Sequence, residues 1–221
     1  MSEMSDTTFP QTAENSRLRE TQLWFEGNTI EGECKINPKS IGVALLMFAN
    51  EAETAHFQQP ADEQQIKDDC RAATLFIVNS KQFDPKCTEA ETALTRAAGV
   101  LRWDDVVMEA FNSKKSFRPL ALAQMLGANG RHENSSIEIA ILIGAHPDLN
   151  ISSETVHGAV DGFAERGETG VIKSLKREGR DMDFLYRNQL AFAERKRAGA
   201  QPSTVAGHED QHNTVSRAIG I

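Results

Sequence analysis

Two histidines four residues apart, His208 and His212, enclose Glu209 near the end of the chain and form the pattern His-Glu-x-x-His. On a helix this spacing places both imidazoles on one face. There they can hold a zinc ion while the glutamate acts as general base in hydrolysis. The neighbouring residues do not favour a packed helix, because Pro202 and Gly207 precede the motif and few residues follow it. We therefore expect a solvated tail, with a metal-dependent hydrolase as the alternative.

The three cysteines, Cys34, Cys70 and Cys87, are the other reactive side chains. Their odd number and wide spacing match neither a disulfide framework nor a zinc ligand set. No histidine lies close in sequence to activate Cys70 or Cys87 as a nucleophile. We expect reduced thiols in a cytoplasmic protein that is not an enzyme and that holds no metal and no cofactor.

Composition excludes several classes of function. The 221 residues carry a formal net charge of −8, which disfavours binding to a phosphate backbone. No apolar run has the roughly 18 residues of a membrane helix, so we expect no membrane association. The N-terminus lacks the basic-then-apolar pattern of a signal peptide. Its first 20 residues are polar, which suits a disordered end or a leader that delivers an effector into a host cell.

An internal repeat of about 33 residues organises the middle of the chain. The segment 79–85 (Asn-Ser-Lys-Gln-Phe-Asp-Pro) recurs in similar form at 112–119. Apolar pairs recur at nearly the same step: Val106-Val107, Ile139-Ala140 and Val171-Ile172. Such a period is typical of a stack of supersecondary units, none of which buries its apolar face alone.

Helical patterning divides the chain into three parts. Residues 1–37 are expected to be mostly disordered or extended, residues 38–198 to form the helical repeats, and residues 199–221 to be a flexible tail. Ser40 is a candidate cap for the first helix, and Pro60 ends it. A second helix is expected over 62–78, because its apolar residues share one face. The predicted fold is all-α, with stacked helical hairpins and flexible termini.

Residues 92–98 and 160–183 resemble ankyrin repeats. Residues 92–98 (Thr-Ala-Leu-Thr-Arg-Ala-Ala) agree with the Thr-Pro-Leu-His-x-Ala-Ala opening of that repeat at Thr, Leu and both Ala. The second segment follows the repeat without a gap at Val160, Ala164, Gly167, Val171, Ile172, Lys173, Leu175, Gly179 and Asp181. The departures are Thr95 and Asp161 in place of the opening histidine, the absence of the turn glycine near Arg102, and about eight additional residues before Ile139.

The resemblance implies an ankyrin-like solenoid that binds another protein as a scaffold, an inhibitor or a microbial effector. Equivalent turn positions of successive units line up in such a stack, so charged turn residues are the candidates for partner binding. These residues are Lys81, Asp84, Lys115, Arg118, Asp148, Arg180 and Asp183. The nearby Phe83, Phe117 and Phe184 are either apolar anchors for the partner or core residues between units.

Other helical arrays remain open from the sequence alone. A different helical repeat or an unrelated helical bundle has similar periodicity. A viral or other structural subunit of nucleocapsid type is the functional alternative, although the net charge of −8 disfavours its nucleic-acid-binding form. The oligomeric state does not follow from these patterns.

We predict that His208→Ala and His212→Ala leave the activity of the protein intact, because the motif lacks a supporting helix and a third ligand. Metal analysis of the purified chain by mass spectrometry, together with a peptidase assay, tests this. Stoichiometric zinc that is lost in either variant along with peptidase activity would contradict it.

Overall fold

The computed structural model describes residues 16–176 and 184–200, which form helices and one short β-hairpin. The hairpin pairs Thr29–Ile30 (β1) with Glu33–Cys34 (β2) in antiparallel orientation, and Glu31 and Gly32 make the turn with positive φ angles. The predicted all-α class is confirmed. Within the described ranges, no helix is both long and apolar enough to cross a membrane.

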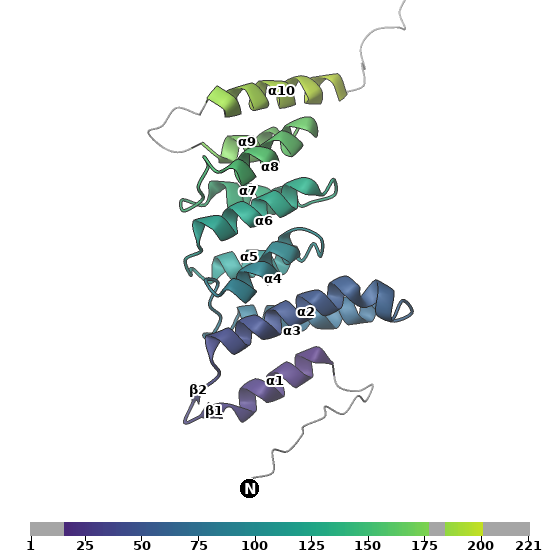
Figure 1. Ribbon diagram of the computed structural model, residues 1–221, viewed down its shortest axis with the longest axis vertical. Helices are drawn as coiled ribbons and strands as arrows, with labels where there is room; N and C mark the ends of the chain where they lie inside the picture. The colour runs from purple at the N-terminus through teal and green to yellow at the C-terminus, as the bar shows by residue number, and fades with distance from the viewer. Residues whose placement is uncertain (1–15, 177–183, 201–221) are drawn as a thin grey trace, which may run out of the picture.

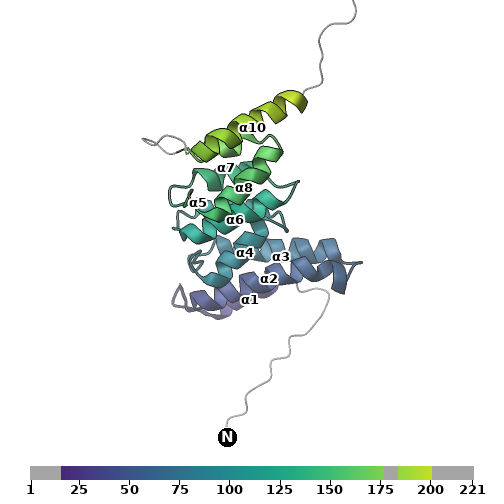
Figure 2. The same cartoon turned by 45° about the horizontal axis from the view of Figure 1, so that its top comes forward.

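The helices form two columns (Figures 1 and 2). The first column contains α2 (Pro38–Gln58), α4 (Thr88–Ala98), α6 (Pro119–Arg131), α8 (Glu154–Glu165) and α10 (Phe184–Ala200). The second column contains α1 (Arg17–Gly27), α3 (Glu63–Val78), α5 (Asp104–Asn112), α7 (Ile137–Ala145) and α9 (Thr169–Ser174). Each helix packs against the next one in its own column. Chain neighbours such as α2 and α3 also pack together as hairpins.

Side-chain caps and prolines mark where several helices begin. Ser136 and Ser153 accept hydrogen bonds from backbone N–H groups in the first turns of α7 and α8. The sequence placed the first cap of the repeat region at Ser40, whereas α2 begins at Pro38 and Asn37 caps it. Proline suits this first position because its missing N–H would have no partner inside the helix.

The N-terminal segment differs from the expectation for residues 1–37. Residues 17–27 form α1, which packs against α3. Phe25 is buried and meets Phe76 edge to face, with ring centroids 5.3 Å apart. The Arg17 guanidinium binds the Glu51 carboxylate at 2.8 Å. Both contacts join residues far apart in sequence, so local patterning does not reveal them.

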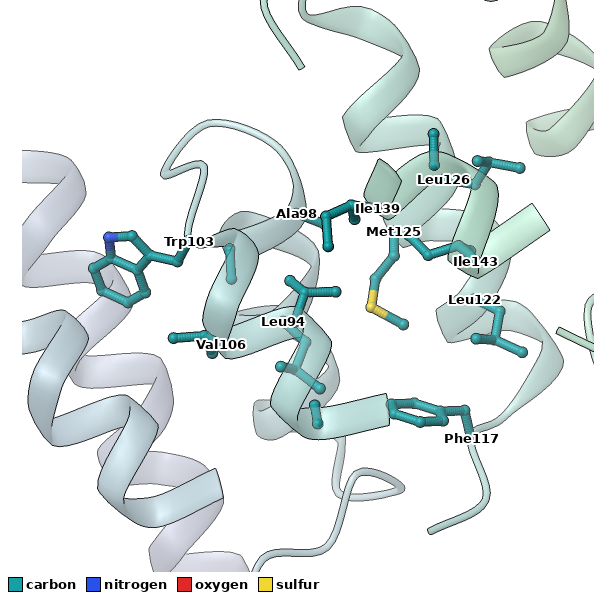
Figure 3. Packing of buried hydrophobic residues seen from close by; sticks show 14 of the residues in the cluster. Leu94, Ala98, Trp103, Val106, Phe117, Leu122, Met125, Leu126, Ile139 and Ile143 are labelled. Atoms are coloured by element: carbon teal, nitrogen blue, oxygen red, sulfur yellow. The ribbon is translucent and has the colours of Figure 1, made fainter. Parts of the chain in front are cut away.

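The apolar core runs between the columns (Figure 3). The recurring pairs of the sequence lie in α5, α7 and α9, and all six residues are buried. Side chains of consecutive hairpins meet in this interior, and Figure 3 labels among others Leu94, Val106, Leu122, Met125, Ile139 and Ile143. Each unit therefore contributes apolar surface that its neighbours cover.

The loops from the second column back to the first follow the repeat as well. Phe83, Phe117 and Leu149 occupy corresponding places in three successive loops, and all three side chains are buried. Inside the hairpins, the turn after α8 uses Gly167 with φ 76°. In the turn after α4, Arg102 adopts φ 55°. Arg102 thus takes the left-handed conformation at the place where the repeat pattern expects glycine.

Glycine lets helices of the first column approach closely. A Cβ built on Gly130 would lie 3.1 Å from the Cα of Ala159, and one on Gly162 would lie 2.9 Å from the carbonyl oxygen of Gly130. By contrast, a Cβ on Gly158, one turn earlier in α8, would meet nothing within 4 Å. Close packing of α6 on α8 therefore depends on Gly130 and Gly162 but not on Gly158.

We predict opposite effects for two alanine substitutions in α8. Gly162→Ala should lower the free energy of unfolding by about 1–3 kcal/mol because backbone must move to admit the methyl group. Gly158→Ala should raise it by up to about 1 kcal/mol through helix propensity. Thermal melting checks both, with about 2–4 °C expected per kcal/mol. Equal shifts in the two variants would show that α6 and α8 are not in this close contact.

Candidate functional site

The charged turn residues predicted for partner binding lie along one edge of the stack. The loops α3–α4, α5–α6 and α7–α8 all lie at the same edge (Figure 1). Lys81, Asp84 and Asp148 are exposed there. The Asp84 carboxylate accepts a hydrogen bond from the backbone N–H of Lys86 at 2.9 Å, which fixes the turn. These three residues present mixed charge to solvent, and their role in binding stays a prediction.

Lys115 is turned toward its own protein. Its Nζ donates to the carbonyl oxygens of Lys81 (3.1 Å) and Phe83, and lies 5.3 Å from the centroid of the Phe83 ring. Burial lowers the pKa of this ammonium group. Lys115 therefore joins two successive loops and has fewer N–H groups left for a partner.

Arg118 also makes a contact within the stack. Its Nε and Nη2 donate to both carboxylate oxygens of Glu91 on α4. The Glu91 side chain is only 7% exposed, and these hydrogen bonds raise the pKa of the guanidinium. Without Arg118, a buried carboxylate would lose its charged partner, which is costly. The residue thus links the α5–α6 loop to the preceding hairpin.

The aromatic residues near these loops were expected to be either anchors for a partner or core residues. Phe83 and Phe117 are buried between units, and Phe117 stacks on Phe111 with ring centroids 4.7 Å apart. Both are therefore core residues in this structure. The side chain of Phe184 lies outside the described residues, as do Arg180 and Asp183.

Cys70 and Cys87 lie in surroundings that disfavour nucleophilic chemistry. All three are free thiols. Burial raises the pKa of Cys70 to about 12, and burial together with the hydrogen bond to Glu89 raises that of Cys87. Both groups are consequently thiols rather than thiolates at neutral pH, and a thiol is a weak nucleophile.

The described residues contain no group of three or more His, Cys, Asp or Glu side chains that could hold a metal ion. His208, Glu209 and His212 fall outside the described ranges.

A groove between α6 and α8 was not expected from the sequence. Its volume is about 400 Å³, and its lining includes Gly127, Gly158, Arg131 and Glu154. Gly158 is exposed, and a Cβ built on it would meet nothing within 4 Å, whereas Gly127 is buried against Thr155. The arginine and the glutamate place opposite charges beside the groove. The sequence shows these glycines, but only the pairing of α6 with α8 brings them to one place.

Comparisons with protein-family models, with curated proteins and with solved structures find no match to this chain.

We predict that Arg118→Ala lowers the melting temperature by several degrees, because it leaves the buried Glu91 carboxylate unpaired. Lys81→Ala is the matched control in the preceding loop, since Lys81 is exposed and should change the melting temperature little. A double-mutant cycle with Glu91→Gln isolates the pair. Additive effects of the two substitutions would contradict a direct Arg118–Glu91 interaction.

Proposed function

We propose that this chain is an ankyrin-like solenoid and works as a non-enzymatic module that binds another protein. Two features support the ankyrin-like assignment. The helices form pairs that stack in two columns, and the segment 160–175, which resembles the repeat, coincides with the α8–α9 hairpin. In that hairpin Gly167 makes the turn with positive φ, and Val171 and Leu175 are buried.

The observation that carries the proposed function is the placement of exposed charged residues from different loops along one edge of the molecule. Lys81 and Asp84 in one loop and Asp148 two loops later lie along the same edge of the molecule. A surface assembled in this way is long, has mixed charge and is held by a rigid core. Charge complementarity on such a surface chiefly determines orientation and association rate.

The module is proposed to act in the cytoplasm, either of its own cell or of a host cell that receives it as an effector. The three free thiols support a reducing compartment. A scaffold and an inhibitor use the same surface, and the identity of the partner distinguishes them.

Affinity capture with the intact chain, followed by mass spectrometry, identifies candidate partners, and titration with the purified partner tests the surface. We predict that the triple variant Lys81→Glu, Asp84→Lys, Asp148→Lys weakens binding by about tenfold or more with little change in melting temperature. Lys115 and Arg118 are omitted because reversing them would also disturb the stack.

Glu138→Lys is the matched control, since Glu138 is exposed on α7 in the second column. It should leave affinity unchanged. If Glu138→Lys abolishes binding while the triple variant binds normally, the proposed edge is not the partner surface.

A further inference from the structure

Helix α2 has three distinct faces. Ile41, Leu45, Phe48, Ala52 and Ala55 share one face, and all but the half-buried Phe48 are buried. A second face meets α4, where Gly42 approaches Cys87 and Ala90, and Glu53 pairs with Arg96 at 3.0 Å. The third face is largely exposed, although Asn50 on it meets Arg96 of α4.

This third face carries a regular row of side chains. The outer row, as we name it, consists of Val43, Met47, Asn50, Thr54 and Phe57, with steps of four, three, four and three residues. Side chains at these steps lie in one line along a helix. Val43, Met47 and Phe57 are 40%, 61% and 83% exposed. Single exposed apolar residues are common on surfaces, but an aligned row of them is typical of a helix interface.

The outer row extends beyond the rest of the stack. α2 and α3 have 21 and 16 residues, whereas α4 to α9 have between 6 and 13, and α10 at the other end of the stack has 17. The far end of the α2–α3 hairpin therefore projects past the other units, with Phe57 in its last turn (Figures 1 and 2). From Val43 to Phe57 the row measures about 21 Å at about 1.5 Å per residue, which matches four turns of a partner helix.

Charge around the projecting end is strongly negative. Residues 50–69 include six acidic residues and one lysine. Among the described residues, Asp62, Asp68 and Asp69 form no ion pair, so their charge is not locally compensated. A partner that covers the outer row would have to bring basic residues to this end.

Asn50 gives the row a polar centre that is held in place. Its side-chain oxygen accepts a hydrogen bond from Nη1 of Arg96, which also pairs with Glu53. Thr54 donates its hydroxyl to the carbonyl oxygen of Asn50 at 2.8 Å. A fixed polar position within an apolar seam selects one register of the opposing helix.

We propose that the outer row binds an amphipathic helix of a partner protein, whose apolar stripe packs on Val43, Met47 and Phe57 and whose flanking lysines or arginines face the acidic end of α2–α3. This inference rests on the proposed protein-binding function and names a partner class for it. A second copy of the chain is disfavoured as the occupant, because a parallel pairing of two rows would bring two such acidic ends together.

The probe is a designed 21-residue helical peptide with leucines at heptad spacing and lysines on both flanks, labelled with fluorescein. A peptide of the same apolar stripe with glutamates on the flanks is its control. Fluorescence anisotropy with the intact chain should show saturable binding of the lysine peptide that weakens with salt, and at least about tenfold weaker binding of the glutamate peptide.

Met47→Gln and Phe57→Gln should each weaken binding of the lysine peptide by about tenfold, with unchanged melting temperature because both side chains are exposed. Met108→Gln on α5 is the matched control, since Met108 is 44% exposed in the second column. Unchanged binding in both outer-row variants overturns the proposal, as does equal affinity for the two peptides.

Sedimentation of the free chain tests whether a second copy of the chain, rather than a partner helix, binds the outer row. A dimer that Phe57→Gln dissociates would assign the outer row to self-association and overturn the proposal.

Failure of the peptide experiments is distinguishable from failure of the proposed function. The loop-edge variants are measured against the captured partner, and their effect does not require the outer row.

Discussion

The close approach of successive helices in the first column is the constraint on which the rest of the structure depends. Gly130 lies against Ala159, and Gly162 lies against the carbonyl of Gly130, so side-chain volume at these points is limited by backbone. Short helices of 9 to 13 residues bury little apolar surface alone, and only stacking completes their core. Small residues at the contacts therefore allow each hairpin to share its apolar surface with two others.

Stacking also determines which charged loop residues remain exposed and which bond within the protein. Arg118 and Lys115 reach back about one repeat, to Glu91 and to the loop that contains Phe83. These contacts hold neighbouring units together. They leave fewer N–H groups of Arg118 and Lys115 for other hydrogen bonds. Lys81, Asp84 and Asp148 occupy similar loops but remain exposed. Equivalent positions in a repeat thus separate into those that hold the stack together and those that face solvent.

Periodicity made much of the fold predictable from the sequence, because recurring features depend on local spacing. The pairs that contain Val106, Ile139 and Val171 identified the second helices, and all are buried. α1 was not predicted, since its burial depends on Phe76, which lies about 50 residues away. The Arg118–Glu91 pair and the groove beside Gly127 likewise require residues from different units to meet. Of the candidate site, the charged turn residues were predictable, but their internal contacts were not.

The α2–α3 hairpin is longer than the hairpins that follow it. A unit needs only enough length to cover its neighbours, as the short α4–α5 hairpin does. The additional turns of α2 and α3 extend past the described helices α4 to α9, and their end is acidic and presents Phe57 to solvent. Core packing does not require this extension, because its exposed residues contribute little buried area. The similar units thus share one continuous core, whereas the unit that departs from them adds an exposed end with acidic residues and Phe57.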